Sequence, residues 1–287
     1  MSKRKKATPT PLTPLGRAAI RRSLLTVLPD RLSRGRLSRA HLAQPIVLRS
    51  VPVFLPGAPD ALHGLRIAHL SDFHVGGLIP VERALEAIEL AQVEQPDLVA
   101  CTGDVVDLEL AGCEPVFKAL GRMKSRLGTL MVMGNHDHLE HAESVARLAR
   151  RSGIRLLQDE VARLPSGPMV AGLDWTVGVR DAQKRLKAML DGREELPPIL
   201  LAHHPAAFRA AAQHGIPLTL SGHTHGLQVG ITRGAGDQSR PARGRALHDG
   251  LYHLGASSVF VTRGIGSWFP LRVNRPAEVA ILDVRVR

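Results

Sequence analysis

The stretch Leu130–Asp137 reads LMVMGNHD and decides the fold. Its apolar first half predicts a buried strand, and a helical pattern begins shortly after it, near Glu140. Between the two lie a glycine, an amide, an imidazole and a carboxylate, which are poor core residues. At the carboxyl end of a strand, such side chains can point together into a crevice. The stretch therefore predicts an α/β protein with a functional site at its strand ends.

Four further stretches repeat this design, because in each an apolar run is followed by residues that bind metals. They are Asp72-Phe73-His74, Gly103-Asp104, His203-His204-Pro205 and Gly222-His223-Thr224-His225. Carboxylate, imidazole and amide ligands together suit Mn²⁺, Fe or Zn²⁺ better than the all-oxygen site that Mg²⁺ prefers. Alternation along an extended chain lets only one residue of the pair His203 and His204 face the site easily, and we predict that it is His203.

In chain order, the motifs D-x-H, G-D, G-N-H-D, H-x-P and G-H-T-H resemble those of the calcineurin-like metallophosphoesterases. The resemblance extends from about Ile46 to the C-terminus. It implies an α/β fold, a four-layer α-β-β-α sandwich of two mixed sheets. It also implies phosphate-ester hydrolysis at two divalent metal ions, by attack of a hydroxide that bridges them. Mn²⁺ is the favoured metal, with Fe or Zn²⁺ as alternatives.

The resemblance also assigns a role to each residue of the motifs. The first metal would be bound by Asp72, His74 and His225, the second by Asn135, His203 and His223, with Asp104 bridging the two. His136 is left free of metal and is the expected catalytic residue, which protonates the leaving oxygen or stabilises the transition state. Asp137 is expected to orient and charge its ring, and Asn135 to lie close to the phosphoryl group.

Two stretches near the C-terminus, Thr262–Gly266 and Pro270–Pro276, resemble a bacterial branch with phosphodiesterases of the YkuE and YaeI type and some UDP-2,3-diacylglucosamine hydrolases. We therefore expect cleavage of phosphodiesters or pyrophosphates, with a phospholipid or a nucleotide-linked lipid as the favoured substrate class. Trp175 stands where the family commonly has Asp, which bears on substrate shape. Two alternatives stay open: a nuclease or phosphomonoesterase of the same fold, and a basic-tailed binding protein with a vestigial metal site.

The positive charge is concentrated at the N-terminus. Residues 1–40 hold eleven Lys and Arg against one acidic residue, Asp30, in a chain of net charge +12. We predict a basic, largely disordered tail over residues 1–42, with a short helix from Pro14 to Leu28 that ends at Pro29, and a catalytic domain over residues 43–287. The favoured partner of residues 1–40 is an anionic membrane. Nucleic acid is less favoured because these residues include no aromatic ring for stacking, and a solvated tail without a partner stays open.

The sequence favours a cytoplasmic protein, held peripherally at a membrane. The apolar run after Arg21-Arg22 ends at Pro29 and is too short for a cleavable signal, and no run is long enough for a transmembrane helix. The two cysteines form no disulfide framework, which favours a reducing compartment. The Gly- and Arg-rich stretch Thr232–Gly250 is expected to form a mobile loop near the site, and Trp268–Leu271 either an apolar lip or a packed turn.

Overall fold

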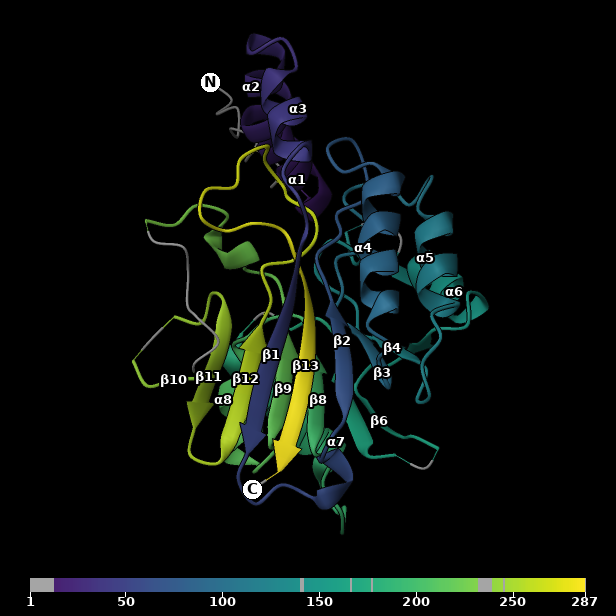
Figure 1. The fold of residues 1–287 in the computed structure, drawn as a ribbon, viewed down its shortest axis with the longest axis vertical. Coiled ribbons are helices and arrows are strands. Elements are labelled where there is room, and N and C mark those ends of the chain that lie inside the picture. The colour runs from purple at the N-terminus through teal and green to yellow at the C-terminus, as the bar shows by residue number, and fades with distance from the viewer. Residues whose placement is uncertain are drawn as a thin grey trace, which may run out of the picture.

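Two mixed β-sheets lie face to face at the centre of the protein, with helices on their outer faces (Figure 1). This computed structural model describes residues 13–139, 142–165, 167–176, 178–231, 239–244 and 246–286. The two mixed sheets and the helices that cover them confirm the expected α/β fold.

The first sheet has the strand order β1-β13-β2-β3-β4-β5. Its strands are β1 (Val47–Leu55), β13 (Glu278–Val286), β2 (Arg66–Leu70), β3 (Leu98–Cys101), β4 (Thr129–Met131) and β5 (Arg155–Leu156). Neighbouring strands pair in parallel, except that β13 and β2 are antiparallel. Parallel strands end at the same edge, so the loops after β2, β3 and β4 lie together.

The second sheet has the order β10-β11-β12-β9-β8-β7-β6. Its strands are β6 (Glu160–Arg163), β7 (Met169–Leu173), β8 (Ile199–Ala202), β9 (Leu218–Ser221), β10 (Arg240–Pro241), β11 (Gly250–Leu254) and β12 (Ser257–Val261). The parallel pair of β8 and β9 forms its centre. Of the loop expected over Thr232–Gly250, residues 232–238 and 245 lie outside the described residues, and Arg240–Pro241 form β10.

Helices cover the outer face of each sheet. They are α4 (Val81–Val93), α5 (Glu114–Gly121) and α6 (Ala142–Arg151) on the first sheet, and α7 (Val179–Leu190) and α8 (Ala207–Gln213) on the second. Two short 3-10 turns cover Asp60–Leu62 and His225–Leu227. Between the sheets lies an aliphatic core in which Ile67 and Leu98 pack with Leu201 and Leu220. The burial of these side chains is the main force that fixes the two sheets together.

Residues 14–42, which the sequence assigned to a largely disordered tail, form helices beyond the strand ends (Figure 1). The helix α1 (Pro14–Arg22) runs through a π-helical turn (Ser23–Val27) into α2 (Leu28–Leu32), and α3 (Arg36–Leu42) follows. No described helix is both long and apolar enough to span a membrane. The predicted disorder of residues 1–12 concerns residues outside those described.

The expectation that the helix ends at Pro29 is wrong. Proline lacks an N–H, and in an α-helix its ring collides with the carbonyl four residues earlier. Here the wider π-helical turn directly precedes it, and the N–H of Leu28 donates to the carbonyl of Ser23. The wider turn lets the chain continue as a helix through Pro29 to Leu32.

Contacts far apart in sequence attach these helices to the sheets. The hydroxyl of Thr26 donates to the carbonyl of Trp268 at 2.7 Å. The guanidinium of Arg83 on α4 donates to the carbonyl of Gln44 at 2.6 Å, just after α3. His41 is buried. The helical segment is therefore packed on the rest of the protein rather than extended into solvent.

Candidate metal centre

All seven expected metal ligands lie in loops that follow strands of the two sheets. From the first sheet come Asp72 and His74 after β2, Asp104 after β3 and Asn135 after β4, and from the second come His203 after β8 and His223 and His225 after β9. The facing sheets bring these loops together at one end. Residues that are more than 150 positions apart, such as Asp72 and His225, are in contact as a result.

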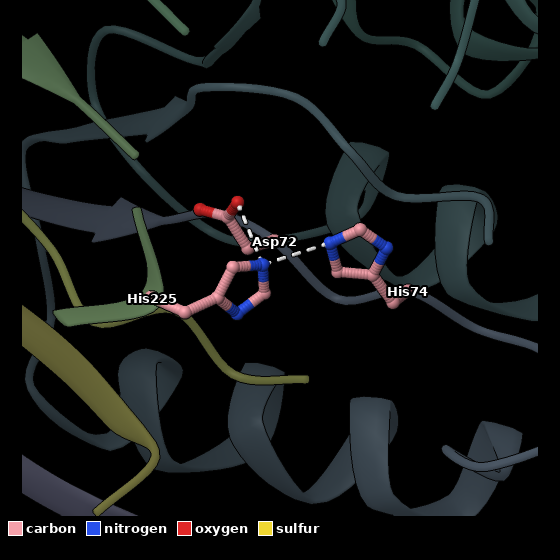
Figure 2. A group of neighbouring side chains, drawn as sticks. All are labelled: Asp72, His74 and His225. Carbon is pink, nitrogen blue, oxygen red and sulfur yellow. Dashed lines mark hydrogen bonds and ion pairs between the residues drawn. The ribbon is translucent and has the colours of Figure 1, made fainter. Parts of the chain in front are cut away.

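Asp72, His74 and His225 form a first cluster, and all three side chains are buried (Figure 2). Nε2 of His74 lies 3.0 Å from Nε2 of His225. Nε2 of His225 lies 3.4 Å from Oδ1 of Asp72. Three donor atoms from two loops thus converge on one small space.

Asp104, His203 and His223 form a second cluster, joined by Asn135. Nδ1 of His223 lies 3.2 Å from Nε2 of His203 and 2.8 Å from Oδ1 of Asn135. Oδ2 of Asp104 lies 3.2 Å from Nε2 of His203 and 3.5 Å from Nε2 of His74 in the first cluster. One carboxylate oxygen therefore stands between the two groups of donors.

The donor atoms of both clusters fit divalent metal ions. Ring nitrogens bind such ions at about 2.0–2.1 Å, so neighbouring donors around one ion lie roughly 3.0–3.4 Å apart. The facing ring nitrogens of His74 and His225 have this spacing. Nδ1 of His203 donates to the carbonyl of Thr102 at 2.6 Å, which leaves its Nε2 as the ring nitrogen turned toward the cluster.

The protonation of the rings also suits metal binding. Burial, followed by the charge of His203, lowers the pKa of His223 to about 3. Burial also lowers the pKa of His225 well below its usual value, and neutral imidazole is the form that binds metals. His203 differs, because burial opposes its charge but the carboxylate of Asp104 raises its pKa to about 9. Nε2 of His203 would have to give up that proton to hold a metal ion.

Five of the seven ligand residues have left-handed backbone conformations. The φ angles are 54° at Asp72, 48° at His74, 53° at Asp104, 69° at His223 and 50° at His225. Side chains other than glycine disfavour this region, and such strain collects at functional sites. The fold therefore holds the ligand loops in conformations that short peptides of this sequence would avoid.

The glycines of the motifs let neighbouring loops approach each other closely. A Cβ atom at Gly134 would lie 2.2 Å from Oδ1 of Asp104, and one at Gly222 would lie 2.2 Å from Oδ2 of Asp72. Any side chain at these two positions would push a ligand carboxylate aside. The close contacts of Gly134 with Asp104 and of Gly222 with Asp72 explain why the motifs have glycine at these two positions.

The ring of His136 is held by Asp107, a residue that the sequence analysis missed. Nδ1 of His136 donates to the backbone carbonyl of Asp107 at 2.7 Å and lies 3.5 Å from its Oδ1. Burial opposes a charge on the ring, but the nearby carboxylates of Asp104 and Asp107 raise the pKa of His136. Nδ1 is thus occupied, and Nε2 is the ring nitrogen that is left to act on a substrate.

The contacts of Asp137 correct its expected role. Its buried carboxylate accepts backbone N–H groups of Asp104 at 2.7 Å, Val105 at 3.0 Å, Val106 at 3.1 Å and Gly134 at 3.0 Å. Asp107, and not Asp137, orients the ring of His136. Asp137 ties the loop after β4 to the loop after β3, which positions His136 and Asp104 relative to each other. The signal for Asp107 was its place three residues after Asp104, beyond an apolar pair.

His204 and Trp175 lie beside the second cluster. Nδ1 of His204 accepts the backbone N–H of Ala206 at 2.9 Å, so it caps its own loop while His203 faces Asp104. The indole of Trp175 lies with its ring centre 5.3 Å from that of His223. Trp175 also lines a cavity of about 540 Å³ together with Asn135 and His136. Trp175 thus borders a cavity that lies beside the second cluster.

Comparison with known proteins agrees with the motifs. Residues 65–227 match the sequence pattern of the family described as "Calcineurin-like phosphoesterase". An uncharacterized metallophosphoesterase of Helicobacter pylori strain J99 is 30% identical over 249 residues, which cover 84% of this chain and 64% of that protein. A Danio rerio transmembrane protein with a metallophosphoesterase domain is 29% identical over 83% of this chain and 57% of that protein. This chain thus spans less than two thirds of the length of these two relatives.

Two shorter bacterial proteins match over most of their length. The uncharacterized metallophosphoesterase YkuE of Bacillus subtilis is 28% identical, with 79% of this chain and 81% of that protein covered. Phosphodiesterase YaeI of Escherichia coli is 27% identical, with 76% and 82% covered. The resemblance to proteins of the YkuE and YaeI type is thus confirmed. With its ligand loops assembled on two facing sheets and its sequence matched over residues 65–227, the chain belongs to the calcineurin-like phosphoesterase family.

Proposed function

We propose that the protein is a binuclear metal-dependent phosphohydrolase that cleaves phosphodiester or pyrophosphate bonds. The observation that carries this proposal is the position of Asp104, whose Oδ2 lies within 3.5 Å of a ring nitrogen from each of the two donor clusters. Two bound divalent ions supply a hydroxide nucleophile at neutral pH and positive charge beside the phosphoryl oxygens. The mixed nitrogen and oxygen donors favour Mn²⁺, with Fe or Zn²⁺ as alternatives.

His136 acts as the general acid in this proposal. Its raised pKa favours the protonated ring, and the contact of Nδ1 with Asp107 leaves Nε2 to face the leaving oxygen. Asn135 lines both cavities at the site together with His136, so its amide can donate to a phosphoryl oxygen. Asp137 holds the two loops that carry these groups and takes no part in proton transfer.

The favoured substrate class is a phospholipid or a nucleotide-linked lipid at an anionic membrane. Ile20, Leu24 and Leu28 recur at intervals of four along the N-terminal helix and are 45%, 58% and 49% exposed. Leu271, in a segment that contacts this helix through Trp268, is 45% exposed. These exposed aliphatic side chains, with the exposed Arg31 and Arg34 further along the same segment, suit insertion into the headgroup region of an anionic bilayer, where a peripheral enzyme can reach lipid phosphates.

The catalytic proposal is tested by metal content and by a substrate panel. After reconstitution with Mn²⁺, elemental analysis should find about two ions per chain, and chelators should abolish activity. Turnover of bis-p-nitrophenyl phosphate above that of p-nitrophenyl phosphate and of DNA supports the phosphodiesterase assignment. The reverse order assigns the site to a phosphomonoesterase or a nuclease. Metal content near zero, or no turnover at all, favours a binding protein with a vestigial site.

The membrane proposal is tested by cosedimentation with vesicles of phosphatidylserine and phosphatidylcholine at low salt. Leu24→Gln together with Leu28→Gln should reduce sedimentation, while Val93→Gln, an exposed apolar residue at the far end of α4, should not. Equal sedimentation of both variants and the wild type would exclude this helix as the membrane contact. Tighter binding to duplex DNA than to vesicles at matched salt would favour nucleic acid.

A further inference from the structure

Helix α1 forms one wall of both cavities at the metal centre. The larger cavity, about 540 Å³, lies between Arg17 and Arg21 of the helix and the loop that carries Asn135 and His136. The smaller cavity, about 260 Å³, is lined by Arg21 together with metal-cluster residues such as His74, Asp104 and His223. Among the α1 residues, Arg21 lines both cavities.

Contacts at two points fix the helix in this position. Nη1 of Arg22 lies 3.8 Å from Oδ2 of Asp107, the residue that holds the ring of His136. Thr26 donates its hydroxyl to the carbonyl of Trp268 at 2.7 Å. Arg22 also lies directly over Gly77, where a Cβ atom would come within 1.7 Å of its Nη2. The helix is therefore seated on the loops of the site rather than loosely laid across them.

The guanidinium of Arg21 is held over the indole of Trp268, with its central carbon 4.9 Å from the ring centre. Attraction to the face of a ring does not use the N–H groups, which lie in the plane of the guanidinium. Within the described part of the chain, no carboxylate forms an ion pair with Arg21. Arg21 thus brings a positive charge and several hydrogen-bond donors to the cavity.

We propose that Arg21 is a catalytic residue that binds the phosphoryl group of the substrate. This inference rests on the proposed phosphohydrolase function and adds the N-terminal helix to the active site. The planar fork of a guanidinium matches two oxygens of a phosphate, and the contact strengthens as negative charge develops on them in the transition state. Because Arg21 shares the smaller cavity with Asn135, His136 and the metal ligands, a phosphate at the metal centre is within the space that it borders.

The test compares Arg21→Ala, Arg21→Lys and the control Arg31→Ala in the full-length, Mn²⁺-loaded protein. Arg31 is an exposed arginine on α2, in the same helical segment. Two quantities are measured: kcat/KM for bis-p-nitrophenyl phosphate, and the dissociation constant of inorganic phosphate by titration calorimetry. Loss of a charge-assisted hydrogen bond predicts roughly a 10–150-fold lower kcat/KM for Arg21→Ala, and weaker phosphate binding. Arg21→Lys should recover part of both, and Arg31→Ala should match the wild type.

Metal content and thermal unfolding separate a phosphate contact from a structural role. If Arg21→Ala retains two metals and binds phosphate as tightly as the wild type, the inference is overturned while the proposed function stands. If Arg21→Ala unfolds or loses metal, Arg21→Gln decides, because it keeps the side-chain stem and removes the charge. Wild-type phosphate affinity in Arg21→Gln likewise overturns the inference. A wild-type protein without turnover refutes the proposed function, and the phosphate titration still tests Arg21.

Discussion

Replacement of His136 by alanine should remove the general acid and leave the metals in place. The ring of His136 contacts Asp107 through Nδ1. The hydrogen bond between His136 and Asp104 uses the backbone N–H of His136, at 2.7 Å, and is therefore kept in the alanine variant. A general acid contributes roughly 10²–10⁴-fold, which corresponds to about 3–5 kcal/mol of transition-state stabilisation. The loss should reach this range only where the leaving oxygen needs a proton.

The assay therefore compares two phosphodiesters with different leaving groups. With an alkyl leaving group, His136→Ala should lower kcat by roughly 10²–10⁴-fold, because an alkoxide leaves poorly without protonation. With p-nitrophenolate, which is stable as an anion, the loss should be about tenfold or less. Elemental analysis checks that metal content is unchanged. Equal losses on both substrates, or loss of metal from His136→Ala, would refute the role of His136 as the acid.

Three further changes test other parts of the site and its support. Asp104→Ala should lose metal and activity together, because its carboxylate faces both donor clusters, and elemental analysis would contradict this if two ions remained. Gly134→Ala should also lower metal occupancy, since its Cβ would lie 2.2 Å from Oδ1 of Asp104. Gly112→Ala, where a Cβ meets no atom within 4 Å but the φ angle of 83° disfavours a side chain, should lower stability and keep its metals. Stability should fall as the pH drops from about 6.5 to about 4, since burial, then Arg272 and Arg83, lowers the pKa of His41 to about 4 and the unfolded chain binds the proton first. His41 contributes up to about 1.4 kcal/mol per pH unit to this fall in the free energy of unfolding. Urea unfolding of His41→Gln should show a shallower fall with pH, and an unchanged fall would exclude His41 as its source.

The gathering of the expected metal ligands could be predicted from sequence, because each of them stands in a short local motif that resembles those of the family. A buried strand followed by Asp, His or Asn identifies a strand end, and parallel strands bring their ends together without any further information. His203 was separated from His204 by the same kind of argument, since neighbouring side chains on an extended chain point to opposite sides. In the structure His203 faces Asp104, and His204 bonds its own loop.

The role of Asp107 was not predicted, because its place three residues after Asp104 brings it near the site but does not show the path of the loop that turns it toward His136. Asp137 is the sequence neighbour of His136, and proximity along the chain favoured it as the partner of the ring. Its carboxylate accepts four backbone N–H groups instead. Buried backbone N–H groups need a hydrogen-bond acceptor, and Asp137 supplies it here. That choice depends on the separation of two loops, which no residue pattern records.

The docking of the N-terminal helices depends on partners that are still further away. Thr26 and Trp268, whose hydrogen bond fixes the helical segment, are 242 positions apart. Composition and charge pattern show that this segment is polar and basic, but they do not show which distant residues it packs against. Its packing became visible only when its neighbours in space were known.

The position of β13 has a consequence for how the protein matures on the ribosome. This strand is the last to be synthesised among those described, yet it lies inside the first sheet, between β1 and β2. Every expected metal ligand, His225 included, has been made well before Glu278–Val286 emerge. Until then β2, which leads to Asp72 and His74, lacks one of its two neighbours. We expect the nascent chain to carry a complete set of expected ligands without a stable binding site until β13 has joined the sheet, so that metal is captured only after that step.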